Sequence, residues 1–309
     1  MIRPRREADT AGLAELVREV APGWVVSEAG IRHRLAAAPA RARRSDWIAE
    51  VAGEVAGWGS SALETDVARD DVASARVMVR PDRRGRGLGT ALYEAAEEHA
   101  RSIGARRLLA GSNDDPASRA FAARRGFRHT RTERLSSLDP RSVDAHELGR
   151  IAAEQAAQGF SLAPFAAFAD RPELIYTVDA EASLDEPNDE QVTDLRLDDW
   201  IDRHWRHPDL SHDGSFAVVH EERPVAIAEL LVDIAGARAA NGFTATLRAY
   251  RGRGLARLAK LASIAWLRDH GVTRVVTQND ETNAPMLAVN RRLGYTPFAS
   301  EHAFVKDFE

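Results

Sequence analysis

The chain has no cysteine among its 309 residues, and this absence removes several kinds of chemistry. Without thiols there is no disulfide, no thiolate zinc site and no cysteine nucleophile. Long apolar runs are missing as well, since no stretch approaches the roughly 20 residues that a membrane-spanning helix needs. The first ten residues carry charge but no apolar core, unlike a signal peptide. We therefore expect a cytoplasmic protein with no membrane partner.

An excess of basic residues is also missing. Lys and Arg number 42 against 47 Asp and Glu, which gives a net charge of -5. This balance does not predict binding to nucleic acid. The apolar fraction of 44% and charged fraction of 29% are typical of a globular protein, and the length suits two domains. A monomer and a homodimer are both compatible with this composition.

The sequence does contain a repeat. Residues Arg84–Gly89 read RGRGLG, and residues Arg251–Ala256 read RGRGLA, at an offset of 167 residues. The similarity continues on both sides of these turns. A period this long indicates two tandem domains rather than a solenoid. We predict an N-terminal domain at residues 1–139, a connecting helix at 140–158 and a C-terminal domain at 159–309.

Each half has the same order of elements. A strand, Ala75–Val79 or Phe243–Leu247, leads into the Gly-rich turn. An amphipathic helix, Leu88–Arg101 or Leu255–Asp269, follows the turn. Strands mixed with helices in this way predict an α/β fold.

The Gly-rich turns match one of three phosphate-binding patterns. Neither turn has the Lys and Ser/Thr pair of a P-loop. A dinucleotide fingerprint would need glycine where Thr90 and Arg257 stand. The remaining pattern, Arg-x-x-Gly-x-Gly/Ala between strand and helix, fits both copies. Glycines let backbone N–H groups approach an anion, the helix start adds further donors, and arginines add charge. A solvated basic turn is the alternative interpretation.

At these residues the chain resembles the GCN5-related N-acetyltransferase (GNAT) superfamily, in a tandem two-domain form of bacterial type. The resemblance implies a mixed α/β sheet in each half and acetyl-coenzyme A (acetyl-CoA) as the acyl donor. In that family the turn binds the cofactor pyrophosphate; the matching residues here are Arg84, Gly85, Arg86, Gly87, Gly89, Thr90, Arg251, Gly252, Arg253, Gly254 and Ala256. The family's preceding strand binds the pantetheine arm; the matching residues are Val77, Met78, Val79, Thr244, Ala245 and Thr246.

The closing motif of the family distinguishes the two halves. In the second half Asn283 corresponds to a residue that can hydrogen-bond the pantetheine amides or the loop backbone. Asn290 lies two helical turns further along the same face. Many family members carry a tyrosine that protonates the leaving thiolate where Ala122 and Asn290 stand here. Because Asn290 can orient the sulfur or acetyl group and alanine cannot, we favour the second half as the catalytic domain.

A base is needed to keep the acceptor amine neutral. Glu229 lies in the predicted strand Val225–Asp233 and faces the same way as apolar residues. We therefore name Glu229 as the candidate base beside Asn290. Glu50 and Glu64 are weaker candidates in the first half.

Two polar segments remain. His204, His207 and His212 lie close in sequence to Asp209 and Asp213. Their spacing matches no metal template, so we expect no metal, and an acceptor-site loop and an ordinary loop both remain open. The acidic segment 185–190 is predicted to be a solvated surface loop.

The leading hypothesis is an acetyl-CoA-dependent N-acetyltransferase in which a small-molecule amine attacks the thioester directly within a ternary complex. An alternative class is a non-catalytic acyl-CoA-binding sensor or scaffold, which the missing tyrosine motivates. A third possibility is catalysis in the N-terminal domain. The acceptor and the acyl chain length are left open by the sequence.

Overall fold

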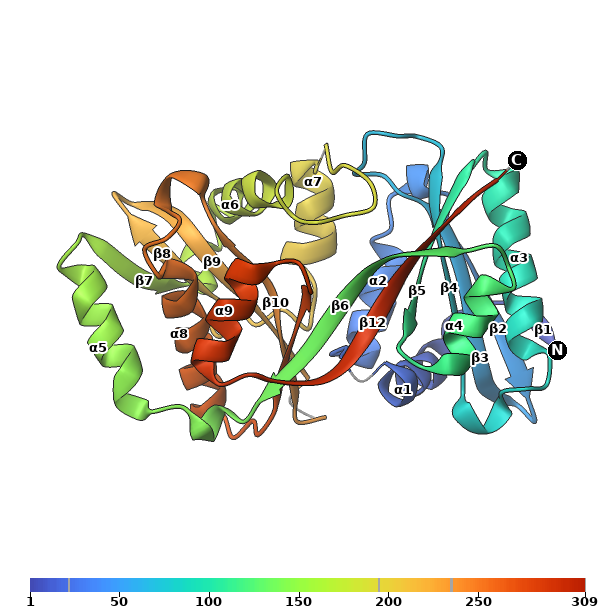
Figure 1. Cartoon of the computed structure of the whole chain (residues 1–309), viewed down its shortest axis with the longest axis horizontal. Helices are drawn as coiled ribbons and strands as arrows, with labels where there is room; N and C mark the ends of the chain where they lie inside the picture. Colours follow the sequence, from blue (N-terminus) through green and yellow to red (C-terminus); the bar gives the residue numbers. More distant parts are fainter. Residues whose placement is uncertain (22, 194, 234–235, 309) are drawn as a thin grey trace. The chain divides into compact units, whose positions relative to one another are not determined.

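The computed structural model describes residues 1–21, 23–193, 195–233 and 236–308 (Figure 1). They form two compact units that are not contiguous halves of the chain. Unit 1 comprises Met1–Glu133, Asn188–Asp194 and Ser300–Glu309, and unit 2 comprises Arg134–Pro187 and Leu195–Ala299. Both contain a mixed sheet with helices, which confirms the predicted fold class. The boundaries at 139 and 159 stay a prediction from the repeat.

In unit 1 the strand order is β1-β2-β3-β4-β5-β12, and β4–β5 is the parallel pair. The strands are β1 (Ile2–Pro4), β2 (Ser45–Val51), β3 (Glu54–Leu63), β4 (Val72–Val79), β5 (Arg107–Asn113) and β12 (Thr296–Asp307). The helices are α1 (Thr10–Val20), α2 (Glu28–Ala36), α3 (Leu88–Ser102) and α4 (Pro116–Ala123).

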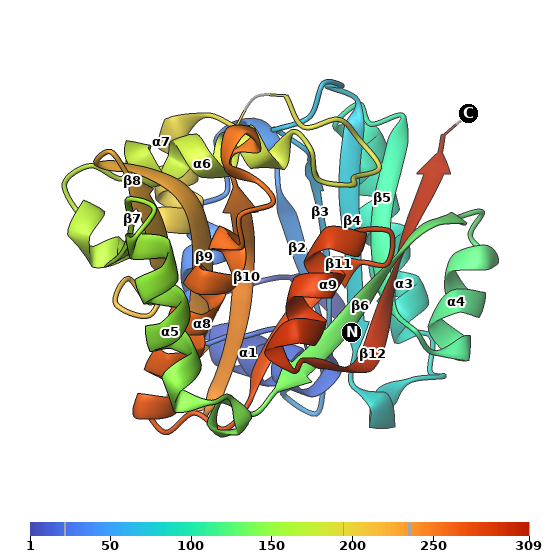
Figure 2. The same cartoon turned by 60° about the vertical axis from the view of Figure 1, so that its left-hand side comes forward.

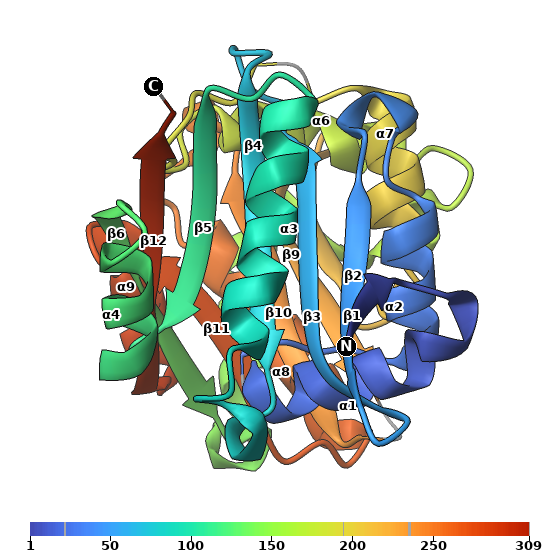
Figure 3. The same ribbon diagram turned by 90° about the vertical axis from the view of Figure 1, so that its right-hand side faces the viewer.

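The helices of unit 1 cover both faces of its sheet. On one face, α1 and α2 bury Leu13, Ile31 and the strand residue Trp58. On the other, α3 runs along β3 and β4 and buries Tyr93 with Leu108 (Figure 3). Burial of such apolar surface supplies most of the driving force for folding. Each face therefore has its own core.

In unit 2 the strand order is β7-β8-β9-β10-β11-β6, and β10–β11 is the parallel pair. The strands are β6 (Arg128–Leu138), β7 (Phe160–Pro164), β8 (Phe216–His220), β9 (Arg223–Asp233), β10 (Arg238–Thr246) and β11 (Val275–Asp280). The helices are α5 (Ala145–Ala156), α6 (Glu173–Ser183), α7 (Leu197–Trp200), α8 (Leu255–Asp269) and α9 (Ala284–Leu293). The predicted helix Leu255–Asp269 is thereby confirmed.

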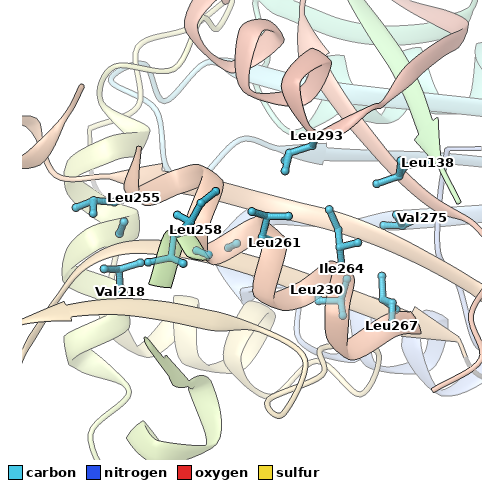
Figure 4. Close-up of a cluster of buried hydrophobic side chains, with 14 of the residues drawn as sticks. Leu138, Val218, Leu230, Leu255, Leu258, Leu261, Ile264, Leu267, Val275 and Leu293 are labelled. Atoms are coloured by element: carbon cyan, nitrogen blue, oxygen red, sulfur yellow. The ribbon is translucent and has the colours of Figure 1, made fainter. Parts of the chain in front are cut away.

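Unit 2 also has a core on each face of its sheet. Helix α8 packs beside α5 and buries Leu258, Leu261 and Ile264 against strand residues such as Leu230 (Figures 2 and 4). Helices α6 and α7 cover the opposite face, where Ile227 of β9 is buried. Side chains alternate between faces along a strand. Glu229, two residues after Ile227, therefore faces α6.

The last strand of each unit lies far along the chain from the strand beside it. Phe304 of β12 pairs with Ala110 of β5 and is buried in the core of unit 1. Leu138 of β6 is buried in the core of unit 2, together with Leu293. Strands β6 and β12 each contribute residues to both units. The cores thus depend on segments far apart in sequence.

In both units the parallel pair is short. Strand β4 pairs with β5 only from Val72 to Ala75, although it continues to Val79. Strand β10 pairs with β11 only from Ala239 to Asn241, although it continues to Thr246. The ends of β4 and β10 thus keep backbone groups that no neighbouring parallel strand uses. Such groups are available to a ligand.

Candidate functional site

Both Gly-rich turns use the same backbone conformation. Gly85 and Gly87 have φ of 74° and 82°, and Gly252 and Gly254 have φ of 79° and 81°. A Cβ built on any of the four would meet no heavy atom within 4 Å. Glycine is required here for the left-handed backbone rather than for space. Gly87 and Gly254 are the N-caps of α3 and α8, whose first N–H groups have no intrahelical acceptor.

The first arginine of each turn is held in the same way. Arg84 Nε donates to the carbonyl oxygen of Val79 at 3.2 Å, and Arg251 Nε donates to that of Thr246 at 3.1 Å. Each bond joins the turn to the last residue of the preceding strand. The two predicted groups of cofactor residues, turn and strand, are therefore adjacent in both units.

An acidic side chain distinguishes the turn of unit 2. Asp185 Oδ2 lies 2.7 Å from Arg251 Nη2, and Asp185 also forms an ion pair with Arg248. These two arginines lower the pKa of Asp185, first through the hydrogen bonds that Arg248 donates to it. The segment 185–190 was expected to be a solvated loop. Asp185 is exposed, as expected of such a loop, and its carboxylate also pairs with the arginine of the turn.

The remaining turn residues have contacts within their own units. Thr90 Oγ1 accepts a hydrogen bond from Arg125 at 2.8 Å. The Arg253 guanidinium lies 5.6 Å from the ring centroid of Tyr250. A Cβ on Gly89 would make ordinary contacts with Phe121 and Val79 at 3.6 Å, so an alanine, as at the equivalent Ala256, fits this position.

The predicted pantetheine residues lie on the ends of β4 and β10 that extend beyond their parallel partners. Val77, Met78 and Val79 follow the last β4–β5 pair, and Thr244, Ala245 and Thr246 follow the last β10–β11 pair. In unit 2 the Oγ1 atom of Thr244 is buried and has no hydrogen-bond partner among the described residues. An orphaned buried hydroxyl is costly unless a ligand satisfies it. The residues present thus fit a ligand with amide groups, such as the pantetheine arm.

Asn283 serves the local structure of α9. Its Oδ1 accepts a hydrogen bond from the backbone N–H of Met286 at 3.2 Å, which is an N-cap interaction. In unit 1, Asp115 caps α4 in the same way through the N–H of Ser118 at 2.8 Å. The capping role therefore recurs in both units.

Asn290 is buried in a polar network that sequence reasoning missed. Its Oδ1 accepts a hydrogen bond from Lys260 Nζ at 2.8 Å, and its Nδ2 donates to Asn279 Oδ1 at 2.6 Å. Lys260 also donates to Thr277 Oγ1 at 3.2 Å. The ammonium group can only donate, which fixes the amide orientation of Asn290. Within the part of the chain that the structure describes, the second N–H of Asn290 Nδ2 has no acceptor.

Lys260 has no exposed surface and no carboxylate partner among the described residues. Burial lowers its pKa to about 7. Its Nζ lies 5.0 Å from the ring centroid of Tyr295, whose hydroxyl donates to Asn241. The sequence signal for it was a lysine at an inward position of the amphipathic helix, between Leu258 and Leu261.

Glu229 lies beside an irregularity in the β9–β10 pairing. The register shifts between Asn241 and Thr244, and there the backbone N–H of Phe243 donates to Glu229 Oε2 at 3.3 Å. Glu229 is 8% exposed. Burial raises its pKa, and the negative charge of Asp179 raises it further.

Asp179 of α6 is the acidic neighbour of Glu229. It accepts hydrogen bonds from Trp200 Nε1 at 2.8 Å and from Ser183 at 3.0 Å. Burial raises the pKa of Asp179, although these hydrogen bonds act against the shift. Two buried carboxyl groups in one environment cannot easily both ionise, so the pair favours holding a proton.

Glu50 and the histidine segment have structural partners. Glu50 lies 2.7 Å from Arg3 in an ion pair, and His212 contacts the carbonyl oxygen of Trp205 at 3.0 Å. Among the described residues, no group of three or more His, Asp or Glu could hold a metal ion. None of the described helices combines the length and apolarity needed to cross a membrane.

Several known proteins are similar to this chain. A curated mycothiol acetyltransferase of Nocardia farcinica is 27% identical over 261 residues, covering 81% of this chain and 78% of the relative. Another, from Thermobifida fusca, is 27% identical over 316 residues, covering 97% of this chain and 94% of the relative. A solved tandem GNAT protein from the clavulanic acid biosynthesis pathway has a TM-score of 0.71 at 23% identity, covering 99% of this chain and 98% of the other.

A GNAT structure from Sphaerobacter thermophilus has a TM-score of 0.67 at 18% identity, covering 99% of this chain and 95% of the other. These two structures support the tandem fold. The profile of the Acetyltransferase (GNAT) family matches the chain twice, over residues 14–127 and 176–295. The protein therefore belongs to the GNAT family as a tandem N-acetyltransferase that uses acetyl-CoA as its donor.

Proposed function

We propose that unit 2 transfers an acetyl group from acetyl-CoA to the amine of a small molecule, and that Glu229 is the general base. The observation that carries this proposal is the Glu229 carboxyl group, which is buried beside the β10 irregularity and has a raised pKa. A carboxylate with a raised pKa is a stronger base than one in water. The relatives named mycothiol acetyltransferase support acetyl transfer to a small molecule.

The chemistry needs a neutral amine next to an activated acyl group. Acetyl-CoA, when bound, supplies the acetyl group as a thioester. The amine nitrogen bonds to the acetyl carbon, the carbon–sulfur bond breaks, and the products are an amide and the free thiol of coenzyme A. Glu229 Oε2 takes the proton that the amine loses. The N–H groups at the ends of β4 and β10 are available to bind and orient the donor.

The role proposed for Asn290 is to orient the leaving sulfur through its remaining N–H. Lys260 and Asn279 hold the amide of Asn290 in one orientation. An N–H donor stabilises negative charge that develops on an acceptor. The proton that the thiolate finally takes comes from water in this proposal, because Asn290 cannot supply one.

The corresponding position of unit 1 lacks a carboxylate. Ala245 pairs with Ile227 in unit 2, and Met78 pairs with Trp58 in unit 1. Two residues after Ile227 on β9 and after Trp58 on β3, Glu229 corresponds to Ser60. Ala122 also stands where unit 2 has Asn290. These differences favour a second role for unit 1, in which it binds acyl-CoA without turning it over.

A matched pair of variants tests which unit turns over the donor. Gly254→Leu and Gly87→Leu change glycines with the same backbone conformation and the same open surroundings. Each variant is assayed for thiol release with acetyl-CoA and a panel of small amines, including acceptors of mycothiol acetyltransferases. We expect Gly254→Leu to abolish turnover and Gly87→Leu to retain it. The opposite pattern would assign catalysis to unit 1.

A further inference from the structure

The face of unit 1 that corresponds to the Glu229 face of unit 2 has the opposite charge. Val79 and Thr246 both accept the Nε hydrogen bond of their turn arginine, which aligns β4 with β10. Three residues back on each strand, Arg76 corresponds to Phe243. Arg76 pairs with Ser60 in the sheet, so both members of the pair differ from unit 2. An arginine therefore stands opposite the position at which unit 2 has its buried carboxylate.

The Arg76 guanidinium lies close to two tryptophan rings. Its Cζ is 4.4 Å from the ring centroid of Trp24 and 5.8 Å from that of Trp58. Arg34 lies 5.3 Å from the Trp24 ring, and Arg44 lies 5.8 Å from the Trp58 ring. Three cations are thus held around two aromatic rings, and cation–π attraction stabilises each of them.

Arg76 differs from Arg44 in having no carboxylate paired with it among the described residues. Arg44 is neutralised by Asp46 at 2.8 Å. Glu64 and Glu301 attract Arg76 through space, yet among the described residues none accepts a hydrogen bond or ion pair from its guanidinium. Burial lowers the pKa of Arg76, and the charges of Arg34 and Arg44 lower it further. An arginine nonetheless stays protonated at neutral pH, so an anion that bound here would relieve this cost.

The location of Arg76 relates this charge to the donor. It is the first residue of β4 beyond the last β4–β5 pair, and it directly precedes the predicted pantetheine residues Val77–Val79. A carboxylate suits such a place better than a phosphate dianion, because a planar monoanion matches the guanidinium fork and is less costly to remove from water. The chemistry expected at Arg76 is therefore recognition of a carboxylate.

We propose that unit 1 contains a carboxylate-binding site, in which Arg76 takes the anion and Trp24 and Trp58 hold the guanidinium in place. The carboxylate belongs either to the acyl chain of a dicarboxylic acyl-CoA or to a separate small ligand. The first source rests on the proposed binding of acyl-CoA by unit 1, whereas the second does not.

Calorimetry on the full chain tests this site. The Gly254→Leu variant, in which the turn of unit 2 is disrupted, is titrated with acetyl-CoA, with succinyl-CoA and with free succinate. Because a charge-assisted hydrogen bond contributes to binding, a carboxylate ligand should bind roughly tenfold tighter to protein that has Arg76 than to protein that lacks it. If the acyl chain is the source, succinyl-CoA binds tighter than acetyl-CoA. If a separate ligand is the source, free succinate binds by itself, including to protein saturated with acetyl-CoA.

The Arg76→Gln change, added to this variant, should abolish the preference for the carboxylate and leave acetyl-CoA binding unchanged. Arg76→Lys keeps the charge but loses the planar fork, and should retain part of the preference. Thermal unfolding of each variant checks that unit 1 stays folded. Equal affinities for acetyl-CoA and succinyl-CoA, together with no binding of succinate, would overturn the proposal. Loss of all acyl-CoA binding, with succinate still bound, would overturn only the role proposed for unit 1 toward acyl-CoA.

Discussion

Lys260 Nζ lies 2.8 Å from Asn290 Oδ1, and this contact joins a fully buried lysine of α8 to a buried asparagine of α9. The two residues are 30 positions apart in the chain. The pair stabilises one orientation of Asn290, although burial of the lysine disfavours its charged form. In unit 1 the position of Lys260 corresponds to Tyr93, whose hydroxyl accepts a hydrogen bond from Lys306.

The first prediction concerns how stability depends on pH. The pKa of Lys260 falls from 10.5 to about 7 in the folded protein, so the unfolded chain binds more protons between these values. The free energy of unfolding should therefore rise with pH in this range, by up to about 1.4 kcal/mol per unit. Lys260→Met should remove this slope in urea titrations between about pH 7 and 9.

The control is Lys306→Met. Lys306 is a partly buried lysine with an ion pair to Glu97 at 2.9 Å. Its removal should leave the alkaline slope as it is in the parent protein. A slope that survives in Lys260→Met would contradict the assignment to Lys260.

Glu229 gives the second prediction. Glu229→Gln should reduce kcat by roughly 10²- to 10⁴-fold and leave acetyl-CoA affinity unchanged, because only the base is lost. Since the pKa of Glu229 is raised, the rate of the parent enzyme should increase with pH as the carboxyl group ionises. The variant should lack this increase. Glu50→Gln, which removes an ion-paired carboxylate of unit 1, serves as the control.

The same group has a stability signature of opposite sign to that of Lys260. A carboxyl group whose pKa is raised on folding binds its proton more tightly in the folded state. Its contribution to stability is present below the unfolded value of 4.5 and is lost as pH rises through the folded value. Glu229→Gln should therefore flatten the decline in unfolding free energy above about pH 5. A decline of unchanged slope would indicate that another group causes it.

Asp185 leads to the third prediction. Its carboxylate forms an ion pair with the guanidinium of Arg251, a residue that we assign to the cofactor pyrophosphate. Asp185→Asn should tighten acetyl-CoA binding to unit 2 several-fold, since a competing anion is removed, and the gain should shrink at high salt. Binding is measured by calorimetry in the Gly87→Leu variant. Because the turn of unit 1 is disrupted there, the acetyl-CoA affinity obtained is that of unit 2. Asp269→Asn, which removes a surface acid paired with Arg268, controls for net charge. Weaker or unchanged binding in Asp185→Asn would argue against competition.

The fourth prediction compares two phenylalanines of β12, Phe304 and Phe298, for their effect on stability. Phe304 is 5% exposed in the core of unit 1, whereas Phe298 is 38% exposed. Phe304→Ala should cost about 3–5 kcal/mol and Phe298→Ala about 0.5 kcal/mol or less. Hydrogen exchange should locate the loss of protection in α3 and β5. Equal costs, or a loss confined to unit 2, would contradict the role of β12 in unit 1.

The sequence by itself determined the features that depend on neighbouring residues. The two Gly-rich turns, the helices that follow them and the α/β class were all predictable, because backbone preferences of glycine and helical periodicity act over a few positions. The predicted helix Leu255–Asp269 agrees with α8 to the residue. Glu229 could be singled out because alternation along a strand placed an acid among inward apolar residues.

Only the tertiary structure decided which distant residues meet. Nothing local in the chain joins Lys260 to Asn290, Asp185 to Arg251, or Arg76 to Trp24. The alternating pattern of a strand likewise specifies which side chains are buried, but not which strand lies beside it. The order β5-β12 in unit 1 and β11-β6 in unit 2 therefore depends on the cores that Phe304 and Leu138 complete. Burial in those cores is a property of the whole fold, and no short segment contains it.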